Sequence, residues 1–546
     1  MVKNMKKQEQ PIFKPELISS LKGYSGAQLG KDLTSGLIVA IIALPLSIAL
    51  ALASGVTPEQ GLYTAIVAGF VISMLGGSRV QIAGPTAAFA TIVAGIVAEN
   101  GFSGLVLATL IAGILLILMG VLKLGSLIKF IPYTITTGFT TGIAVTLIIG
   151  QIKDFLGLTF VNSPIETMEK VEEVIHQFHT FNFEALIIGA VSLAVLIIFP
   201  KFIKKIPPSI FAIVISAVLV KVFDMNVNTI GSLYTISSAL PVPSIPEFSF
   251  DTVKAIIPDA FTIAVLAAVE SLLSCVVADG MTGNRHNSNT ELIAQGAGNI
   301  ASALFGGIPA TGAIARTAAN IKNGGKTPVA GMVHAVVLLL VLVVLMPYAA
   351  LIPMPTIAAI LFVVAYNMSE WREFVAIVRK SPKSDTLVLL VTFVLTVVFD
   401  LVVAIIAGVI LATVLFMKRM SDVTDAHELK ETDKNSEDAK VLPENTLVFE
   451  ITGPIFFGAS AKIADVVRNG DKQVIILCMK SVPAIDATGL HSLETIIKLC
   501  KKQERTIILS HVNEQPMQSL EKAKLLDEVL IAQNIDEALE MASAKA

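Results

Sequence analysis

Long apolar stretches separated by short polar loops run to about residue 420, and this pattern predicts membrane-spanning helices. Residues 33–58, 100–122 and 130–152 contain no Asp, Glu, Lys or Arg. A helix of roughly 20 apolar residues crosses the ~30 Å hydrocarbon core of a bilayer. We expect fourteen apolar segments, which begin near residues 33, 60, 85, 103, 130, 185, 207, 257, 291, 313, 328, 353, 386 and 401.

The composition of the 546 residues supports an integral membrane protein. Hydrophobic residues make up 54% and charged residues only 15%, which is more apolar surface than a water-soluble core can hide. The net charge of -3 argues against a nucleic-acid partner, and the polar start MVKNMKKQEQ does not resemble a cleavable signal. The three cysteines, Cys275, Cys478 and Cys500, have no metal-binding or disulfide spacing. We therefore expect no metal and no cofactor.

The basic residues predict the orientation of the segments, because Lys and Arg collect in cytoplasmic loops. In the fourteen-segment assignment they fall on one side, which should be the cytoplasm and should hold both termini. These residues are Lys3, Lys6, Lys7, Arg79, Lys123, Lys129, Lys201, Lys204, Lys205, Arg285, Lys322, Lys326, Arg372, Arg379, Lys380, Lys383, Lys418 and Arg419.

The character of the chain changes after Met417. The charged stretch KRMSDVTDAHELKETDKNSEDAK reads as a solvated linker. Short apolar runs then alternate with helix-like segments, as in a small α/β domain with one sheet. We expect an N-terminal cytoplasmic segment at 1–30, a membrane domain at 31–420, a linker at 421–442 and a cytoplasmic α/β domain at 443–546.

Seven segments precede the loop at about 223–254 and seven follow it, so the second half should be inverted relative to the first. Each half contains a helix too short to span. One follows Gly84-Pro85, and the other follows the Gly-Pro break at Pro309. Pro85 lies 39 positions after Leu46, and Pro309 lies 39 positions after Glu270. Two half-helices whose N-termini meet near the midplane would create an anion site. Alternatively, the prolines merely kink ordinary helices.

Glu270 is the only charged residue between Asp259 and Asp279, halfway through a predicted span. Burying it in charged form costs on the order of 3 kcal/mol, so it should face a cavity, hold a proton or meet a cation. It could bind and release a proton, or ligate Na⁺ together with Ser274 one turn on. The alternative is a structural carboxylic acid that is hydrogen-bonded to a neighbouring helix.

Arg316 is the other charge within the predicted spans. It could neutralise a bound anion, pair with Glu270, or anchor its helix by snorkelling to the interface. His334 stands alone in an apolar run and is more typical of a packed core histidine than of a ligand. Nowhere do a nucleophile, a base and an orienting group converge, so we do not expect an enzyme.

Several long motifs resemble the SulP anion transporters, also called solute carrier family 26. They are GLYTAIVAG, GGSRVQIAGPTAAF, the stretch from SLLSCVVADGMTGN to ATGAIARTAANI, and the terminal VPAIDATGL. Among bacterial branches the chain is most similar to the dicarboxylate-uptake type. The resemblance implies an all-α polytopic membrane domain with a UraA-like fold, in which fourteen segments form a 7+7 inverted repeat, plus a small α/β STAS domain. It also implies a core and a gate domain, elevator-type movement, a homodimer and a bacterial inner membrane.

The same resemblance implies a set of site residues. The substrate anion would bind between the starts of the two short helices, with Glu270 as the residue linked to H⁺ or Na⁺ coupling. Animal relatives carry Gln and Phe near the positions of Leu46 and Leu50, so backbone donors and Thr86 are the expected contacts here. The expected substrate-binding residues are Leu46, Leu50, Thr86, Ala87, Ala88, Ala313, Ile314, Ala315 and Arg316.

The terminal module resembles a STAS domain, in which a Ser or Thr within D-x-[ST]-G can be phosphorylated. Asp486-Ala487-Thr488-Gly489 matches that motif. A phosphate on Thr488 would sit favourably at a helix N-terminus. Thr488 is therefore a candidate for regulation or for docking of a cytoplasmic protein partner, with a purely structural turn as the alternative.

The expected function is secondary uptake of a small anion with H⁺, with a C4-dicarboxylate favoured and sulfate or bicarbonate as relatives' substrates. Anion entry into a negative-inside cell is opposed by ~2.3 kcal/mol per charge per 100 mV, and a co-bound cation removes that penalty. Na⁺ coupling is the closest variant. A passive anion channel and a membrane-bound sensor are the competing classes.

Overall fold

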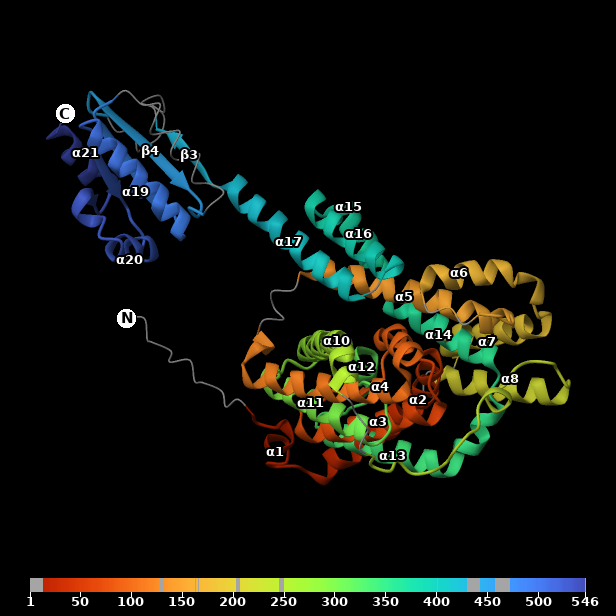
Figure 1. Ribbon diagram of the computed structural model, residues 1–546. Coiled ribbons are helices and arrows are strands. Elements are labelled where there is room, and N and C mark those ends of the chain that lie inside the picture. Colours follow the sequence, from red (N-terminus) through yellow and green to blue (C-terminus); the bar gives the residue numbers. More distant parts are fainter. Residues whose placement is uncertain are drawn as a thin grey trace. The chain divides into compact units, whose positions relative to one another are not determined.

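The computed structural model describes residues 13–126, 132–162, 164, 166–202, 207–244, 250–399, 401–429, 442–456 and 472–545. The chain divides into two compact units, Met1–Val409 and Ile410–Ala546. In its described part the first unit is helical apart from two short strands, and the second contains a five-stranded sheet (Figure 1). The expected combination of a helical membrane domain and a small α/β domain is confirmed.

The first half of the helical unit runs from α1 to α8. Its elements are α1 (Glu16–Ser20), α2 (Gly26–Ala53), α3 (Pro58–Leu75), β1 (Ala83–Gly84), α4 (Ala87–Val121), α5 (Tyr133–Leu156), α6 (Thr167–His176), α7 (Phe183–Phe202) and α8 (Pro208–Val222). Gly101, with φ 67°, interrupts α4, so that α4 counts as two helical segments. With α1 and α6 left aside as short connecting helices, this half supplies seven segments.

The second half contains seven further segments. Its elements are α9 (Ile230–Leu233), α10 (Phe250–Thr282), α11 (Ser288–Leu304), β2 (Thr311–Gly312), α12 (Ile314–Lys322), α13 (Val329–Leu345), α14 (Met354–Met368), α15 (Trp371–Lys380), α16 (Lys383–Val398) and α17 (Leu401–Val423). With α9 and α15 set aside, the described residues contain the fourteen expected segments. Seven of the described helices are long and apolar enough to cross a membrane by length and composition alone.

The two halves pack in a matched way, as expected of two repeats. Helix α3 packs on α13, and its counterpart α11 packs on α4. Likewise α2 packs on α13, and α10 packs on α4. The α4–α11 contact is close because Gly113 and Gly296 face each other; a Cβ on Gly296 would lie 2.4 Å from the Gly113 carbonyl oxygen. Small residues permit such close helix contacts in membranes.

The remaining spans form a second group of helices. Helix α5 packs on α14 and α16, and α7 packs on α8 and α14. We call α2, α3, α4 and α10 to α13 the core helices, and α5, α7, α8, α14 and α16 the gate helices. Many apolar side chains on both groups are exposed, including Leu118, Ile197 and Leu340. Such surfaces suit lipid, in which exposed apolar side chains carry no penalty.

The second unit is built on one sheet with strand order β3–β4–β5–β6–β7. Its elements are β3 (Asp425–Glu428), β4 (Thr446–Thr452), β5 (Val474–Ser481), α19 (Ala487–Lys502), β6 (Thr506–Ser510), α20 (Glu514–Lys522), β7 (Leu530–Ala532) and α21 (Ile535–Ser543). Strand β3 is antiparallel to β4, and the other pairs are parallel. Successive residues Ile475 and Ile476 belong to two different cores, because side chains alternate between the faces of a sheet.

The predicted linker at 421–442 differs partly from the structure. Its first residues complete α17, and Asp425–Glu428 form the edge strand β3, whose backbone pairs with β4. Backbone pairing at a sheet edge tolerates charged side chains, so the composition of this stretch gave no sign of a strand. Residues 430–441 of the predicted linker and residues 1–12 of the predicted N-terminal segment lie outside the described residues.

Candidate functional site

The two short strands bring the starts of the two half-helices together. Strand β1 pairs with β2 in antiparallel fashion, with Ala83 opposite Gly312 and Gly84 opposite Thr311. Helix α4 begins three residues after β1, and α12 begins two residues after β2. The chain before each helix is therefore extended, and the alternative in which Gly84-Pro85 and Pro309 only kink continuous helices is wrong.

Polar side chains satisfy the extended backbone around β2. Asn299 accepts a hydrogen bond from the Ala310 N–H and donates one to the Ala310 carbonyl, both at 2.8 Å. The Ile308 N–H donates to the Thr64 hydroxyl at 2.7 Å. Thr311 donates to the Ala267 carbonyl of α10 at 3.0 Å. Non-helical backbone within a membrane is tolerated only when its polar groups find such partners.

Side chains of α12 form hydrogen bonds with the extended backbone before β1. The Ile82 N–H donates to the Thr317 hydroxyl at 3.0 Å, and Asn320 Nδ2 donates to the Val80 carbonyl at 2.8 Å. Thr317 and Asn320 are both buried. The two half-helices and their strands are consequently one interlocked unit, in which each half supports the backbone of the other.

Arg316 lies in the first turn of α12 and is buried, with 3% of its surface exposed. Its Nη2 donates to the Pro85 carbonyl, while Nη1 has no hydrogen-bond partner among the described residues. The guanidinium lies so close to Gly84 that a Cβ there would be 2.5 Å from Nη1. Snorkelling to the interface is therefore wrong for Arg316.

Glu270 of α10 faces the start of α4. The Thr86 hydroxyl donates to Glu270 Oε2 at 2.8 Å. Thr86 is the N-cap residue of α4, yet its side chain makes no capping bond, and α12 also lacks a side-chain cap. Both helix ends thus keep first-turn N–H groups without a side-chain acceptor. Glu270 and Arg316 interact electrostatically, but no ion pair within 4.0 Å joins them in the described structure.

These residues line one cavity of about 450 Å³. Most of the predicted substrate-binding residues meet there, together with Glu270. They are Leu46, Leu50, Thr86, Ala87, Ala313, Ile314, Ala315 and Arg316. Most of the remaining lining comes from gate helices and is largely apolar, with Leu196, Ile360 and Val363 as examples. The cavity therefore lies between core and gate helices.

Two of the residues predicted for substrate binding or cation coupling lie outside the cavity lining. Ala88 is buried inside the first turn of α4, with 2% of its surface exposed. Ser274 is fully buried, and its hydroxyl donates to Thr317 at 3.3 Å. Glu270 and Ser274 therefore do not form the expected joint Na⁺ site. Ser274 lies one turn further along α10 than Glu270, and its side chain packs against α12. His334 is fully buried, as expected of a core histidine.

Gln81 packs against β2 and was not among the residues predicted from the sequence. Its Nε2 donates to the Ser271 carbonyl at 3.3 Å, and the Cys275 thiol donates to its Oε1 at 2.5 Å. A Cβ on Gly312 would lie 1.4 Å from Gln81 Nε2, so this amide fills the space left by the glycine. The sequence feature that could have indicated this role is an amide side chain between Val80 and Ile82, three positions before Gly84.

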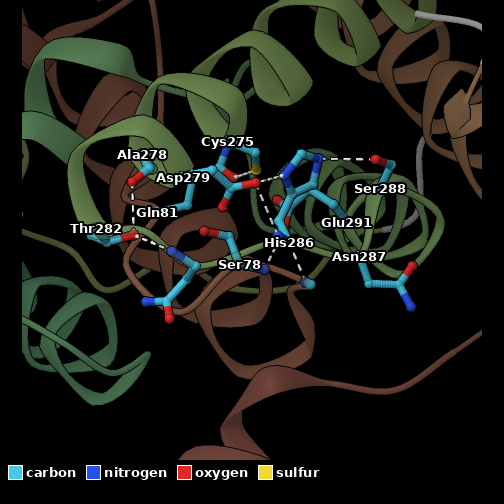
Figure 2. A network of polar contacts seen from close by, with 12 residues as sticks. Ser78, Gln81, Cys275, Ala278, Asp279, Thr282, His286, Asn287, Ser288 and Glu291 are labelled. Carbon is cyan, nitrogen blue, oxygen red and sulfur yellow. Dashed lines mark hydrogen bonds and ion pairs between the residues drawn. The ribbon is translucent and has the colours of Figure 1, made fainter. Parts of the chain in front are cut away.

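A polar network continues from Gln81 around the connection between α10 and α11 (Figure 2). His286 Nδ1 lies 2.7 Å from Asp279 Oδ2, and its Nε2 lies 2.9 Å from the Ser288 hydroxyl. Glu291 is fully buried and accepts hydrogen bonds from the N–H groups of Gly77 and Ser78. The network ties the chain that enters β1 to the helices α10 and α11.

In the second unit, the D-x-[ST]-G motif forms the start of α19. Asp486 is the N-cap residue, and its Oδ1 accepts a hydrogen bond from the Gly489 N–H at 2.7 Å. Thr488 is the second residue of the helix and is exposed. Its hydroxyl is therefore accessible at a helix N-terminus.

Comparison with family models shows which family the chain belongs to. Residues 29–392 match the model of the Sulfate permease family, and residues 438–538 match that of the STAS domain. The chain belongs to the Sulfate permease (SulP) family of anion transporters and carries a C-terminal STAS domain. It is a multi-pass membrane protein and a transporter, not an enzyme.

Two relatives are similar over nearly their whole length. The "Putative sulfate transporter YvdB" of Bacillus subtilis is 41% identical over 518 residues, covering 93% of this chain and 96% of that protein. The "Bicarbonate transporter BicA" of Picosynechococcus sp. is 33% identical over 520 residues, covering 91% of each. Both names refer to inorganic anions.

Two solved structures are similar in fold. The murine Solute Carrier 26 family member A9 anion transporter has a TM-score of 0.87 at 18% identity, covering 97% of this chain and 94% of that chain. The transmembrane domain of a cyanobacterial BicA has a TM-score of 0.64 at 30% identity, covering 70% of this chain and 98% of that chain. The first likeness concerns the fold alone.

Proposed function

We propose that the chain is a secondary active importer of a small anion, which binds in the cavity between the starts of α4 and α12. The observation that carries the proposal is Arg316, a buried cation whose Nη1 has no hydrogen-bond partner among the described residues. It lines the same cavity as Thr86 and Ala313, the residues that precede the two half-helices. A guanidinium and two helix N-termini that converge on one space favour a negative ligand.

We propose that Glu270 couples uptake to protons. When its carboxylate is ionised, it repels an anion in the cavity and competes for the charge of Arg316. When Glu270 is protonated, Arg316 acts on the anion unopposed, and Thr86 still has a hydrogen-bond partner. Anion and proton therefore bind together and are released together. A dianion carried with protons avoids part of the opposing membrane potential, ~2.3 kcal/mol per charge per 100 mV.

For the substrate we propose sulfate first, with bicarbonate as the alternative. The names of the two relatives support these two ions. A C4-dicarboxylate, which was the substrate expected from the sequence, is therefore no longer favoured. Succinate and fumarate are tested as competitors in the assay. The substrate also fixes the coupling ion. A bicarbonate ion that moves with a proton is equivalent to CO₂ and water, so a bicarbonate importer would need Na⁺ instead.

Na⁺ coupling has less support from the site. Glu270 shares its cavity with Arg316, a positive charge that opposes a second cation. Ser274, the expected partner ligand, turns toward Thr317.

The packing supports an elevator-type movement. The half-helices, β1, β2 and Glu270 belong to the core helices and are hydrogen-bonded to one another, whereas the gate helices contribute mainly apolar side chains to the cavity. An apolar boundary is one along which a rigid core can slide. We further propose a homodimer in a bacterial inner membrane, cytoplasmic termini, and a regulatory or partner-docking role for the STAS domain through Thr488.

The test is uptake by the purified full chain in proteoliposomes. Labelled sulfate is offered with a pH gradient, with a Na⁺ gradient or with neither, and unlabelled bicarbonate, succinate and fumarate are added as competitors. We expect saturable sulfate uptake that is driven by an acidic exterior. Counterflow of labelled sulfate separates a carrier from a channel, because unlabelled sulfate on the opposite side accelerates the entry of label through a carrier but not through a channel. An absence of both uptake and counterflow, with ligand-dependent change at Thr488, would favour the sensor.

A further inference from the structure

The cavity contains a third charged residue, Glu370. Its lining includes three charged side chains among the residues that the structure describes: Glu270, Arg316 and Glu370. Glu370 comes from the junction of α14 and α15 and not from the core helices. Arg316 is buried and Glu270 is partly buried, whereas Glu370 is exposed. Glu370 therefore marks the rim of the cavity, and the other two lie deeper.

The local backbone conformation at Glu370 does not require a carboxylate side chain. Glu370 has φ 45° and ψ 29°, in the left-handed region, and begins α15 as its N-cap residue without a side-chain capping bond. Gly or Asn adopts this conformation with less strain than Glu. Neither a hydrogen bond nor an ion pair to its carboxylate is found in the described part of the chain. Local folding thus leaves its charge unexplained.

With all three groups ionised, the cavity has one positive and two negative charges. Protonation of Glu270 removes one negative charge, but the negative charge of Glu370 stays at the solvent-exposed rim. We propose that Glu370 is a charge-selectivity residue. Its carboxylate weakens the binding of anions that enter past the rim, and it weakens the binding of a dianion more than that of a monoanion. This inference rests on the proposed function, since it assumes that the anion binds in this cavity.

The charge dependence gives a quantitative expectation. The repulsion by one fixed charge is proportional to the charge of the anion, so its effect on the dissociation constant of a dianion is the square of its effect for a monoanion. Across a wet rim we expect Glu370→Gln to tighten bicarbonate binding about two- to three-fold and sulfate binding about four- to nine-fold. Both factors should shrink as ionic strength rises, because the rim is exposed.

The experiment is isothermal titration calorimetry of the purified full chain with sulfate and with bicarbonate. Glu373→Gln is the matched control, because Glu373 is also exposed, lies one helical turn away on α15, and does not line the cavity. Both variants change the net charge equally. Glu370→Asn serves as a second variant, since Asn tolerates the left-handed conformation and keeps the test valid if the Gln variant does not fold.

We expect both Glu370 variants to tighten sulfate binding more than bicarbonate binding, and Glu373→Gln to have a clearly smaller effect on both. Equal shifts in the Glu370 and Glu373 variants, or a sulfate shift no larger than the bicarbonate shift, would overturn the inference. Binding without transport by the wild type would contradict the proposed function alone, because the ratio of binding shifts still decides the role of Glu370. Absence of any anion binding would overturn both.

Discussion

The Thr86 hydroxyl donates a hydrogen bond of 2.8 Å to the Glu270 carboxylate, although 184 positions separate the two residues. Thr is a residue that ordinarily caps a helix through its side chain, and here it serves the carboxyl group instead. The start of α4 therefore keeps its N–H groups for another acceptor. One hydrogen bond thus connects the proposed proton carrier to the proposed anion site.

Glu270→Gln should abolish the response of uptake to a pH gradient. The amide keeps a hydrogen-bond partner for Thr86 but cannot exchange a proton, so anion exchange at equal pH should persist. Uptake of labelled sulfate into proteoliposomes with an acidic exterior measures this. Glu99→Gln is the control, because Glu99 is an exposed residue of α4 that lies outside the cavity lining. Uptake in Glu270→Gln that still rises strongly as the outside pH falls would contradict the coupling role.

Arg316→Met should weaken anion binding at least about thirty-fold, in line with the ~2–5 kcal/mol cost of removing one partner of a buried charge pair. Arg316→Lys should bind better than Arg316→Met but worse than the wild type. Lysine keeps the charge but lacks the second nitrogen that reaches the Pro85 carbonyl. Sulfate titration calorimetry distinguishes the three proteins. Equal binding by the wild type and Arg316→Met would remove Arg316 from the site.

Gly84→Ala and Gly312→Ala should each impair transport. Their added Cβ atoms would lie 2.5 Å from Arg316 Nη1 and 1.4 Å from Gln81 Nε2. Overpacking of this kind costs about 1–3 kcal/mol and would displace the residues that flank the cavity. Gly280→Ala on α10 is the control, since no heavy atom lies within 4 Å of its Cβ position. Counterflow rates that are equal in all three variants would show that the close contacts at β1 and β2 are dispensable.

Asp486→Ala should loosen the start of α19. Loss of an N-cap typically costs about 1 kcal/mol, which corresponds to roughly five-fold faster amide exchange at Gly489, whose N–H is held by Asp486. Asp486→Asn should preserve the protection, because Asn is also a good cap. Hydrogen exchange on the full chain measures both. Thr488→Ala should leave Gly489 protected, so a loss of protection in that variant would contradict the assignment of the cap to Asp486.

The membrane domain was largely predictable because its signals are local. Runs of apolar residues predicted all fourteen segments, and the matching Gly-Pro breaks at Pro85 and Pro309 pointed to the half-helices. Isolated charges within predicted spans pointed to Glu270 and Arg316, and the resemblance in motif added their expected roles in the site. The support for these residues was not predictable, because Gln81, Asn299 and Thr317 act through contacts with distant backbone. A polar residue in an apolar stretch signals a partner but does not name it.

The sequence by itself determined that this chain is a membrane protein with two inverted halves, interrupted helices and a separate α/β domain. Hydropathy and backbone-breaking residues act over one helix at a time, so these features can be read without a partner. Only the tertiary structure decided that Ser274 turns away from the cavity, that Arg316 reaches the Pro85 carbonyl, and that Glu370 joins the cavity from the junction of α14 and α15. Those outcomes depend on which helices pack together. The angle at which two helices cross determines which side chains meet, and the spacing of residues along one helix does not reveal that angle.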